Sequence, residues 1–206
     1  HALMTTQNTA QVTSLYEGRI LDMLNNHLNV VETCIKANIN TVEAMADACV
    51  AAFNSGNKLM FCGNGGSAAD AQHFSAEFMI RFVNDRPSLP AIALNTDTSA
   101  LTACGNDYGY DFVFSRQIEG LGQKGDVLFA ISTSGTSPNV VKAIEAAKAK
   151  GMTVIGLTGK DGGSMLESCD IVLHVADKAT MHIQETHATA LHMMCTLVES
   201  KMGFEK

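Results

Sequence analysis

The sequence has no tryptophan and only three prolines, and its 14 Lys and Arg residues are outnumbered by 21 Asp and Glu residues, for a net charge of −7. A nucleic-acid surface needs a basic stripe, so this charge balance argues against DNA or RNA as a partner. No apolar run approaches the roughly 20 residues of a membrane span, and no basic segment followed by an apolar core opens the chain. We therefore expect no membrane anchor and a cytoplasmic location.

Paired cysteine motifs are also absent, because the six cysteines are scattered without a Cys-x-x-Cys spacing. Most of them lie in apolar surroundings, which favours reduced, buried thiols over disulfides or a zinc knuckle. What the chain does have is 46% hydrophobic residues over 206 positions, enough to bury one sizeable core. We expect one domain over 1–206, with a helical arm over about 1–56 and an α/β core over about 57–206.

Apolar residues recur at helical spacing over the first 56 positions, which predicts two helices whose apolar faces pack on the core or on another subunit. Short apolar runs then alternate with helical patterns, and each run has the length of a strand buried on both faces. The predicted strands are 58–63, 91–94, 126–132, 153–159 and 170–175, and a last helix is predicted from about Met181 to Lys201. This order predicts a three-layer α/β sandwich around a central, parallel, five-stranded sheet, doubly wound in the flavodoxin-like manner.

The stretch CGNGGSAAD follows the first predicted strand and opens a helix. Its glycines at 63, 65 and 66 allow positive φ and close backbone approach, and Ser67 is the expected N-cap of the helix. The amides of such a loop can face an anion. The stretch is not a Walker loop, because the Gly-Lys-Ser/Thr ending is missing, and it lacks the spacing of the dinucleotide fingerprint.

A second strand, loop and helix unit, FAISTSGTSPNVV, carries five hydroxyl side chains between Ser132 and Ser137. Pro138 stands in the first helical turn, where a missing amide hydrogen costs nothing. Hydroxyl donors and free helix amides together suit a phosphate monoester on a small molecule. Each loop taken alone is compatible with an ordinary turn, but two of them at strand carboxyl ends of one sheet favour a ligand site.

Two helices carry histidines that are candidates for chemistry. His73 and Glu77 are four residues apart, so on a helix they share a face at about 6 Å and suit a metal ion or a substrate. A packed core histidine, with Arg81 pairing Glu77 at the surface, is the alternative explanation. The last helix has three histidines, more than a plain core helix would offer, and we do not expect all three to be functional: His182, His187 and His192.

Six stretches between about Asn57 and Glu199 form a specific combination: CGNGGSAADAQHFSAEF, RPSLPAIALNTD, GNDYGYDFVFSRQI, KGDVLFAISTSGTSPNVVKAIEAAKAKGM, LTGKDGG and IQETHATALH. Together they resemble the phosphoheptose isomerases, members of the sugar isomerase (SIS) domain group. The resemblance implies interconversion of sedoheptulose 7-phosphate and D-glycero-D-manno-heptose 7-phosphate, in the heptose branch of lipopolysaccharide synthesis. It also implies a homotetramer with sites at subunit contacts and one zinc ion per subunit.

The same resemblance implies the site residues. The implied substrate contacts are Asn64, Gly65, Gly66, Ser67, Glu77, Asn106, Asp107, Ser132, Thr133, Ser134, Ser137 and Gln184. The implied metal ligands are His73, Glu77, Gln184 and His192, with Glu77 and His192 as the implied acid/base pair. Moving a carbonyl from C2 to C1 passes through an enediol, so one carboxylate near both carbons can carry the proton, and an imidazole can exchange protons with the oxygens.

One pair of implied ligands raises a geometric question. Gln184 and His192 are eight residues apart, a rise of ~12 Å on a straight helix, whereas both must come within ~2 Å of one ion. Either Gln184 lies at a frayed helix start, or the contacts come from different subunits. In addition, His182 stands where most relatives have arginine before Ile-Gln-Glu, so any anion contact made by that arginine is in doubt here.

The alternative to an enzyme is a noncatalytic relative of the same fold, which binds the bacterial replication initiator protein. That relative lacks the acid at the position of Glu77 and has asparagine where His192 stands. Because this sequence keeps both, an enzyme is favoured. A regulator that senses sugar phosphates would need an attached DNA-binding domain, for which these residues offer no segment.

Overall fold

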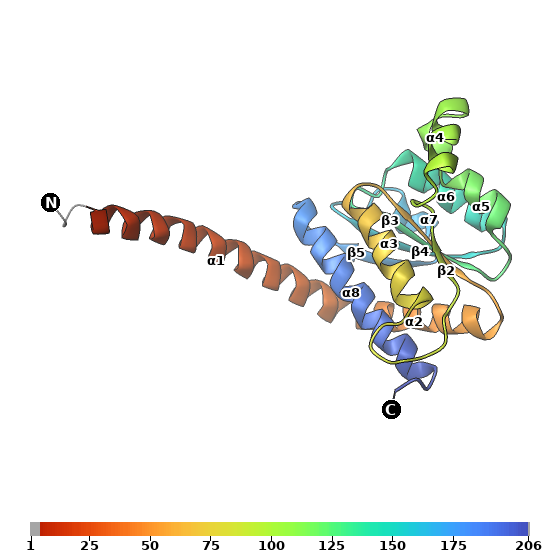
Figure 1. The fold of residues 1–206 in the computed structure, drawn as a ribbon, viewed down its shortest axis with the longest axis horizontal. Coiled ribbons are helices and arrows are strands. Elements are labelled where there is room, and N and C mark those ends of the chain that lie inside the picture. The colour runs from red at the N-terminus through yellow and green to blue at the C-terminus, as the bar shows by residue number, and fades with distance from the viewer. Residues whose placement is uncertain (1–4, 206) are drawn as a thin grey trace.

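The computed structural model describes residues 5–205, with side chains described from residue 16 onward. Two helices precede the sheet, as predicted (Figure 1). The elements in chain order are α1 (Thr5–Ala37), α2 (Ile39–Asn54), β1 (Leu59–Gly63), α3 (Gly66–Met79), β2 (Ala91–Ala93), α4 (Thr98–Asp107), η1 (Tyr110–Phe112), α5 (Ser115–Leu121), β3 (Val127–Ser132), α6 (Pro138–Ala149), β4 (Thr153–Gly159), α7 (Met165–Ser168), β5 (Ile171–Val175) and α8 (Thr180–Lys201). Each predicted strand is confirmed to within one residue at either end.

The five strands form one sheet in the order β2-β1-β3-β4-β5, and every neighbouring pair is parallel. From β1 the chain moves outward to β2 and then returns to place β3 on the other side of β1. The strand order therefore reverses between β1 and β3, where ligands bind in open α/β sheets. Gly63 at the end of β1 is in register with Ile131 near the end of β3, so the loops that follow these strands are neighbours.

Both faces of the sheet are covered, which confirms the three-layer arrangement. Successive side chains of a strand point to opposite faces, and Met60 and Phe61 accordingly belong to two different cores. The core around Phe61 is completed by α2, α3 and α8, whereas the core around Met60 is completed by α5 and α6. The strands are buried on both sides, so their continuous apolar runs follow directly from the fold.

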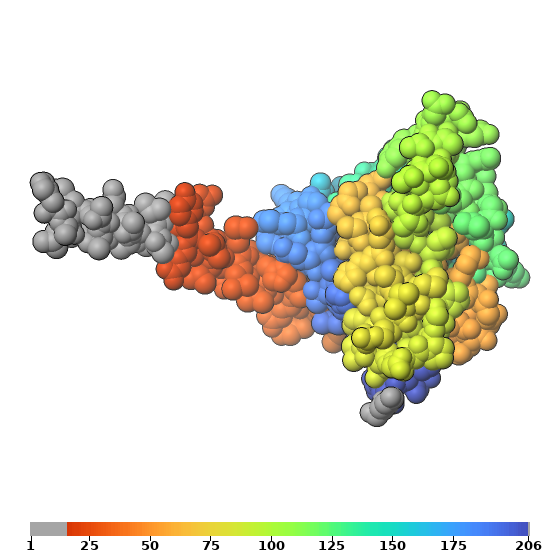
Figure 2. Space-filling model, in the orientation of Figure 1, coloured from red at the N-terminus to blue at the C-terminus, as the bar shows by residue number. Residues whose placement is uncertain are grey.

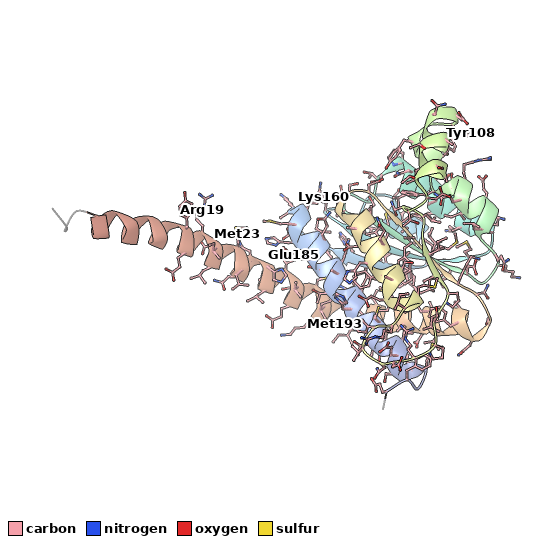
Figure 3. All side chains as sticks on the ribbon, viewed as in Figure 1. Arg19, Met23, Tyr108, Lys160, Glu185 and Met193 are labelled. Atoms are coloured by element: carbon pink, nitrogen blue, oxygen red, sulfur yellow. The ribbon has the colours of Figure 1, made fainter. Side chains whose placement is uncertain are left out.

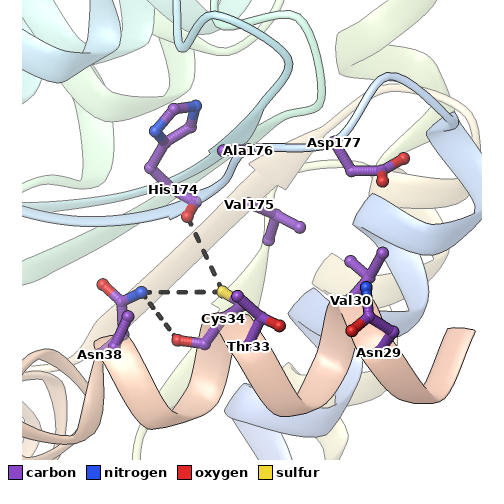
Figure 4. Close-up of a pocket in the computed structure, with 10 residues that line it drawn as sticks. Asn29, Val30, Thr33, Cys34, Asn38, His174, Val175, Ala176 and Asp177 are labelled. Atoms are coloured by element: carbon purple, nitrogen blue, oxygen red, sulfur yellow. Dashed lines mark hydrogen bonds between the residues drawn. The ribbon is translucent and has the colours of Figure 1, made fainter. Parts of the chain in front are cut away.

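Helix α1 projects from the body of the molecule as a long arm (Figures 1 and 2). Its C-terminal part contacts α8 and β5. There Cys34 lies 3.7 Å from the carbonyl oxygen of His174, and Asn38 donates a hydrogen bond of 2.8 Å to the Cys34 carbonyl, at the edge of a cavity of about 250 Å³ (Figure 4). Further out, the arm exposes large apolar side chains: Tyr16, Ile20, Leu21, Met23, Leu24 and Leu28. The side chain of Leu15, part of the same predicted pattern, lies outside the described residues.

All six cysteines are free thiols, and four of them are buried: Cys34, Cys49, Cys62 and Cys195. Burial raises the pKa of Cys62 to about 12, so that thiol stays protonated and acts as a small apolar side chain. The prediction of reduced, buried cysteines is confirmed for these positions. Among the described residues, no helix is long and apolar enough to cross a membrane.

Candidate active site

The loops after β1 and β3 are joined by two asparagine side chains. Asn64 follows β1, and Asn139 lies in the first turn of α6 with 2% of its surface exposed. Each amide nitrogen donates to the other side chain's oxygen at 2.8 Å, and the Tyr110 hydroxyl donates to the Asn64 oxygen at 3.3 Å. The predicted glycine loop and hydroxyl loop are therefore held side by side. Asn139 was not predicted, although its place just after Ser-Pro at a helix start was the available signal.

The hydroxyl loop gathers its side chains at the N-terminus of α6. The Ser132 hydroxyl lies 2.9 Å from that of Ser137 and 3.4 Å from that of Ser134. Pro138 stands in the first turn of α6, as predicted, and is its first residue. Ser137 is the N-cap, but its side chain makes no capping hydrogen bond. Its hydroxyl thus remains with the cluster. Thr133 belongs to the same turn and is half-buried.

The glycine loop differs from the prediction at its helix start. Helix α3 begins at Gly66, its N-cap is Gly65 at φ +56°, and no side chain caps it. Ser67 is instead a buried helical residue, so the prediction that it caps the helix is wrong. The reason is that the first turn forms earlier: the Ser67 amide already donates to the Asn64 carbonyl oxygen at 3.0 Å, and the Ala68 amide donates to that of Gly65 at 3.1 Å. Gly65 allows this early start because glycine accepts positive φ.

Gln184 reaches this loop from α8. A Cβ added to Gly66 would collide with the Gln184 amide, so the absence of a side chain at Gly66 makes room for it. Helix α8 begins at Thr180 and is regular through Gln184 and His192. Gln184 is therefore not at a frayed helix start, and the explanation that remains for a shared ion is a contribution from different subunits.

His73, Glu77 and His192 form the centre of the candidate site. His73 Nε2 lies 2.8 Å from Glu77 Oε1, and the rings of His73 and His192 are 5.0 Å apart at their centroids. One ligand atom from each of the three lies within 4.8 Å of the others. The side chain of Glu77 is 21% exposed and that of His73 is 46% exposed, so the group is open to a small molecule. The alternative of an ordinary core histidine at position 73 is therefore wrong.

Of the three histidines on α8, only His192 faces α3. His187 is fully buried, its Nε2 lies 2.9 Å from the Thr158 carbonyl oxygen, and burial lowers the pKa of its imidazole to about 4. His187 is thus a neutral, structural residue. His182 lies near Glu185 and the arm instead. The expectation that not all three histidines belong to the site is consistent with this placement.

Helices α3 and α8 lie side by side (Figures 1 and 2) and are held there by a buried ion pair. Arg86 Nε donates to Glu199 Oε1 at 2.9 Å, and both side chains are at most 2% exposed. Arg86 also donates to the main-chain oxygens of Glu77 and Phe78 at 2.6 and 3.0 Å, which satisfies carbonyls at the C-terminus of α3. The pair therefore sets the position of Glu77 relative to His192. Sequence reasoning missed it, since no local pattern links residues 113 positions apart.

A further carboxylate on α3, Asp70, was also missed. Burial raises the pKa of Asp70 to about 6, while the charge of nearby His73 opposes the rise. Its Oδ2 is buried and has no partner among the described residues. Its place three residues before His73, one helical turn away, was the signal in the sequence.

Asn106 and Asp107 end helix α4, which projects from the body (Figure 1). Both are exposed, and Asn106 donates a hydrogen bond of 2.8 Å to Asp107. Figure 3 shows the neighbouring Tyr108 at the tip of this projection. The structure thus places these two predicted contacts on an exposed, projecting segment.

The fold and these loops define a class, and comparison with known proteins agrees: residues 23–159 match the SIS domain family. The chain is 58% identical over 159 residues to a phosphoheptose isomerase of Burkholderia pseudomallei (strain 1710b), covering 77% of this chain and 81% of that protein. It is 50% identical over 180 residues to that of Campylobacter concisus, covering 86% and 95%. The solved phosphoheptose isomerase GmhA from Neisseria gonorrhoeae superposes with a TM-score of 0.84 at 41% identity, covering 90% and 99%. The chain belongs to the phosphoheptose isomerase family of SIS-domain proteins.

Proposed function

We propose that this protein is a phosphoheptose isomerase that interconverts sedoheptulose 7-phosphate and D-glycero-D-manno-heptose 7-phosphate, in the heptose branch of lipopolysaccharide synthesis. The observation that carries the proposal is the group of Glu77, His73 and His192, with ligand atoms within 4.8 Å of one another. A carboxylate and imidazoles are the groups that this proton transfer needs. The named relatives are isomerases, which favours an enzyme over the noncatalytic alternative.

The hydroxyl loop is the proposed phosphate site. The Ser132 hydroxyl lies 2.9 Å from that of Ser137 and 3.4 Å from that of Ser134. This cluster is at the N-terminus of α6, the positive end of the helix dipole. A phosphate monoester there would accept from the hydroxyls and from amides of the first helical turn. The sugar chain would then extend past Asn64, which the Asn139 amide holds in place.

Glu77 is the proposed proton carrier. His73 engages Oε1 of Glu77 at 2.8 Å, which leaves Oε2 to take the proton from the carbon that bears the hydroxyl and to return it to the neighbouring carbon. As the carbonyl moves, one oxygen gains a proton and the other loses one. His192 is suited to that exchange because an imidazole has one nitrogen that can donate a proton and one that can accept it.

The donor set fits a zinc ion, and we propose one per subunit held by His73, Glu77, His192 and Gln184. Two imidazoles and a carboxylate are ligands that zinc prefers, and they already converge within 4.8 Å. When bound, the ion would supply a Lewis acid that polarises the carbonyl. Because α8 is regular between Gln184 and His192, the proposal takes Gln184 from a different subunit than His192.

A homotetramer is the proposed assembly. The exposed apolar side chains of α1 support it. An open groove of about 360 Å³ where α1, α2 and α8 meet also supports it. The groove is lined by Ile35, Ile39, Val42, Glu43, Met193, Thr196 and Leu197. A second chain that covers these surfaces would also bring Asn106 and Asp107, or Gln184, to another subunit's site. We place the enzyme in the cytoplasm, where its six thiols stay reduced.

One assay tests the proposal directly. Pure protein is incubated with sedoheptulose 7-phosphate, and aldose formation is followed with and without a chelator, then after zinc is restored. Aldose formation that falls with the chelator and returns with zinc is the expected result. A protein that binds the sugar phosphate but forms no aldose under any of these conditions would instead support the noncatalytic alternative.

A further inference from the structure

A second group of metal-binding side chains lies where the arm meets α8. His27 of α1 and Glu185 of α8 are 158 residues apart in sequence, yet His27 Nδ1 lies 2.7 Å from Glu185 Oε2. His182, one turn before Glu185, places its Nδ1 3.3 Å from the same oxygen. Figure 3 shows Glu185 near the start of α8, beside the part of α1 that carries Met23. Two imidazoles thus converge by the same ring nitrogen on one carboxylate oxygen.

The geometry suits a transition-metal ion. Ligand atoms around a tetrahedral ion with bonds of about 2.1 Å lie roughly 3.4 Å from one another. In this group the three ligand atoms lie within 4.8 Å of one another, with separations of 2.7 and 3.3 Å to Glu185 Oε2. Small rotations of the His27 and Glu185 side chains would therefore complete the arrangement. Two histidines and one glutamate also form a recurrent zinc ligand set, which leaves a fourth position for water.

The surroundings allow an ion to enter and stay. His182 is buried, with its side chain 9% exposed, so one ligand is held in place by packing. The side chains of His27 and Glu185 are 32% and 46% exposed, which leaves them able to adjust. They border an open cavity of about 350 Å³, whose other lining residues are Met23, Leu24 and Met181. The cavity is thus open to solvent, and an ion can reach the three side chains from there.

This group shares no side chain with the candidate active site, although Glu185 directly follows Gln184 in the sequence. Glu185 and His192 are seven residues apart on the regular helix α8, a rise of about 10 Å. No single ion can therefore join the two groups within one chain. The group also joins α1 to α8, so an ion here would act on the position of α1.

We propose that His27, His182 and Glu185 form a second site for zinc or a similar divalent transition metal, which fastens α1 to α8. Binding replaces the protons that the two imidazoles share with the carboxylate: each Nδ1 gives its lone pair to the ion, and any proton it carried is released to solvent. Binding therefore replaces the two hydrogen bonds of Glu185 with three bonds to the ion, from His27, His182 and Glu185, and holds α1 against α8. The proposal does not depend on isomerase activity.

Metal counting on the full chain tests the proposal. The protein is stripped with a chelator, equilibrated with zinc and analysed for bound metal, and cobalt(II) is titrated in parallel so that tetrahedral absorption reports ligand geometry. With one ion at each group, the wild type should hold about two ions per chain, and His27→Asn and His73→Ala about one each. The double variant should hold none. Asparagine at position 27 can still donate to Glu185, so arm packing is retained while the imidazole is lost.

Two further measurements keep the outcome decisive. In the His73→Ala background, zinc should raise the melting temperature, and His27→Asn should abolish that rise. Glu185→Gln should lose the same ion as His27→Asn, whereas His174→Asn, which changes a histidine outside both groups, should lose none. If His27→Asn leaves the zinc count of the His73→Ala protein unchanged, or if that protein binds no zinc, the group is a hydrogen-bonded link only and the proposal is wrong. If the active site itself holds no metal, the His73→Ala protein should bind as much zinc as the wild type, and that result would contradict the active-site zinc rather than this second site.

Discussion

Replacing Glu77 by glutamine separates proton transfer from binding. The glutamine oxygen can still accept the hydrogen bond of 2.8 Å that links this position to His73, and the side chain keeps its shape. The main-chain oxygen of residue 77 still accepts from Arg86 at 2.6 Å, so the end of α3 keeps its anchor. What is lost is the ability to take a proton from carbon. The substitution therefore removes the proposed chemistry while it leaves the helix in place.

The expected size of the effect follows from that role. Loss of a positioned general base lowers turnover by ~10²- to 10⁴-fold, which corresponds to about 2.7 to 5.4 kcal/mol of transition-state stabilisation. Binding of the sugar phosphate should largely survive, because the hydroxyl loop lies on β3 and α6 rather than on α3. The melting temperature should stay within a few degrees of wild type, since an isosteric change at a partly exposed position costs little.

The assay measures turnover of sedoheptulose 7-phosphate, affinity for the sugar phosphate, and metal content, first for the wild type and then for Glu77→Gln. His192→Asn serves as a matched variant, since it removes the second proposed acid/base group from the other helix. Metal content matters because glutamine is a weaker zinc ligand than glutamate. If Glu77→Gln turns over at a near-wild-type rate with equal metal content, the proton-carrier role is refuted.

Three other predictions address the phosphate site, the core and the assembly. Ser132→Ala combined with Ser137→Ala removes both hydroxyls of the 2.9 Å contact. It also removes two hydrogen bonds to the charged phosphate, each worth ~1.5 to 3 kcal/mol, so the Michaelis constant should rise. An unchanged Michaelis constant and an unchanged affinity for the sugar phosphate would rule out this loop as the phosphate site. Although burial raises it, hydrogen bonds from Lys58 and neighbouring amides hold the pKa of Asp126 below its ordinary 3.8. Its stabilisation is thus complete well above pH 3.8 and is lost as the pH falls through the lowered pKa. In denaturant titrations Asp126→Asn should therefore be about 1 to 3 kcal/mol less stable than wild type at pH 7, and a gap that does not narrow as the pH falls below 3.8 would contradict this. Light scattering at micromolar concentration should show an oligomer, most plainly a tetramer, and a monomer would contradict the proposed shared sites.

The local elements were determined by the sequence alone, because short-range periodicity reports which faces are buried. Continuous apolar runs such as 127–132 predict strands buried on both sides, and the observed β3 is buried at every position. The sequence pattern also predicts that the two loops lie together, since parallel strands end at one edge of the sheet. The spacing of His73 and Glu77 likewise predicted a shared helix face, and the 2.8 Å contact is its consequence. Resemblance to a family supplied the chemistry.

Tertiary packing decided the rest, because it depends on contacts between residues far apart in the chain. Three histidines recur every five residues on α8, and only the docking of α8 on α3 determines that His192, rather than His182 or His187, meets His73. The buried pair of Arg86 and Glu199 that fixes this docking spans 113 positions. The close approach of the Gln184 amide to Gly66 at the start of α3 likewise joins two elements far apart in the chain. His27 meets Glu185 because α1 packs against α8. No local sequence pattern predicts that contact.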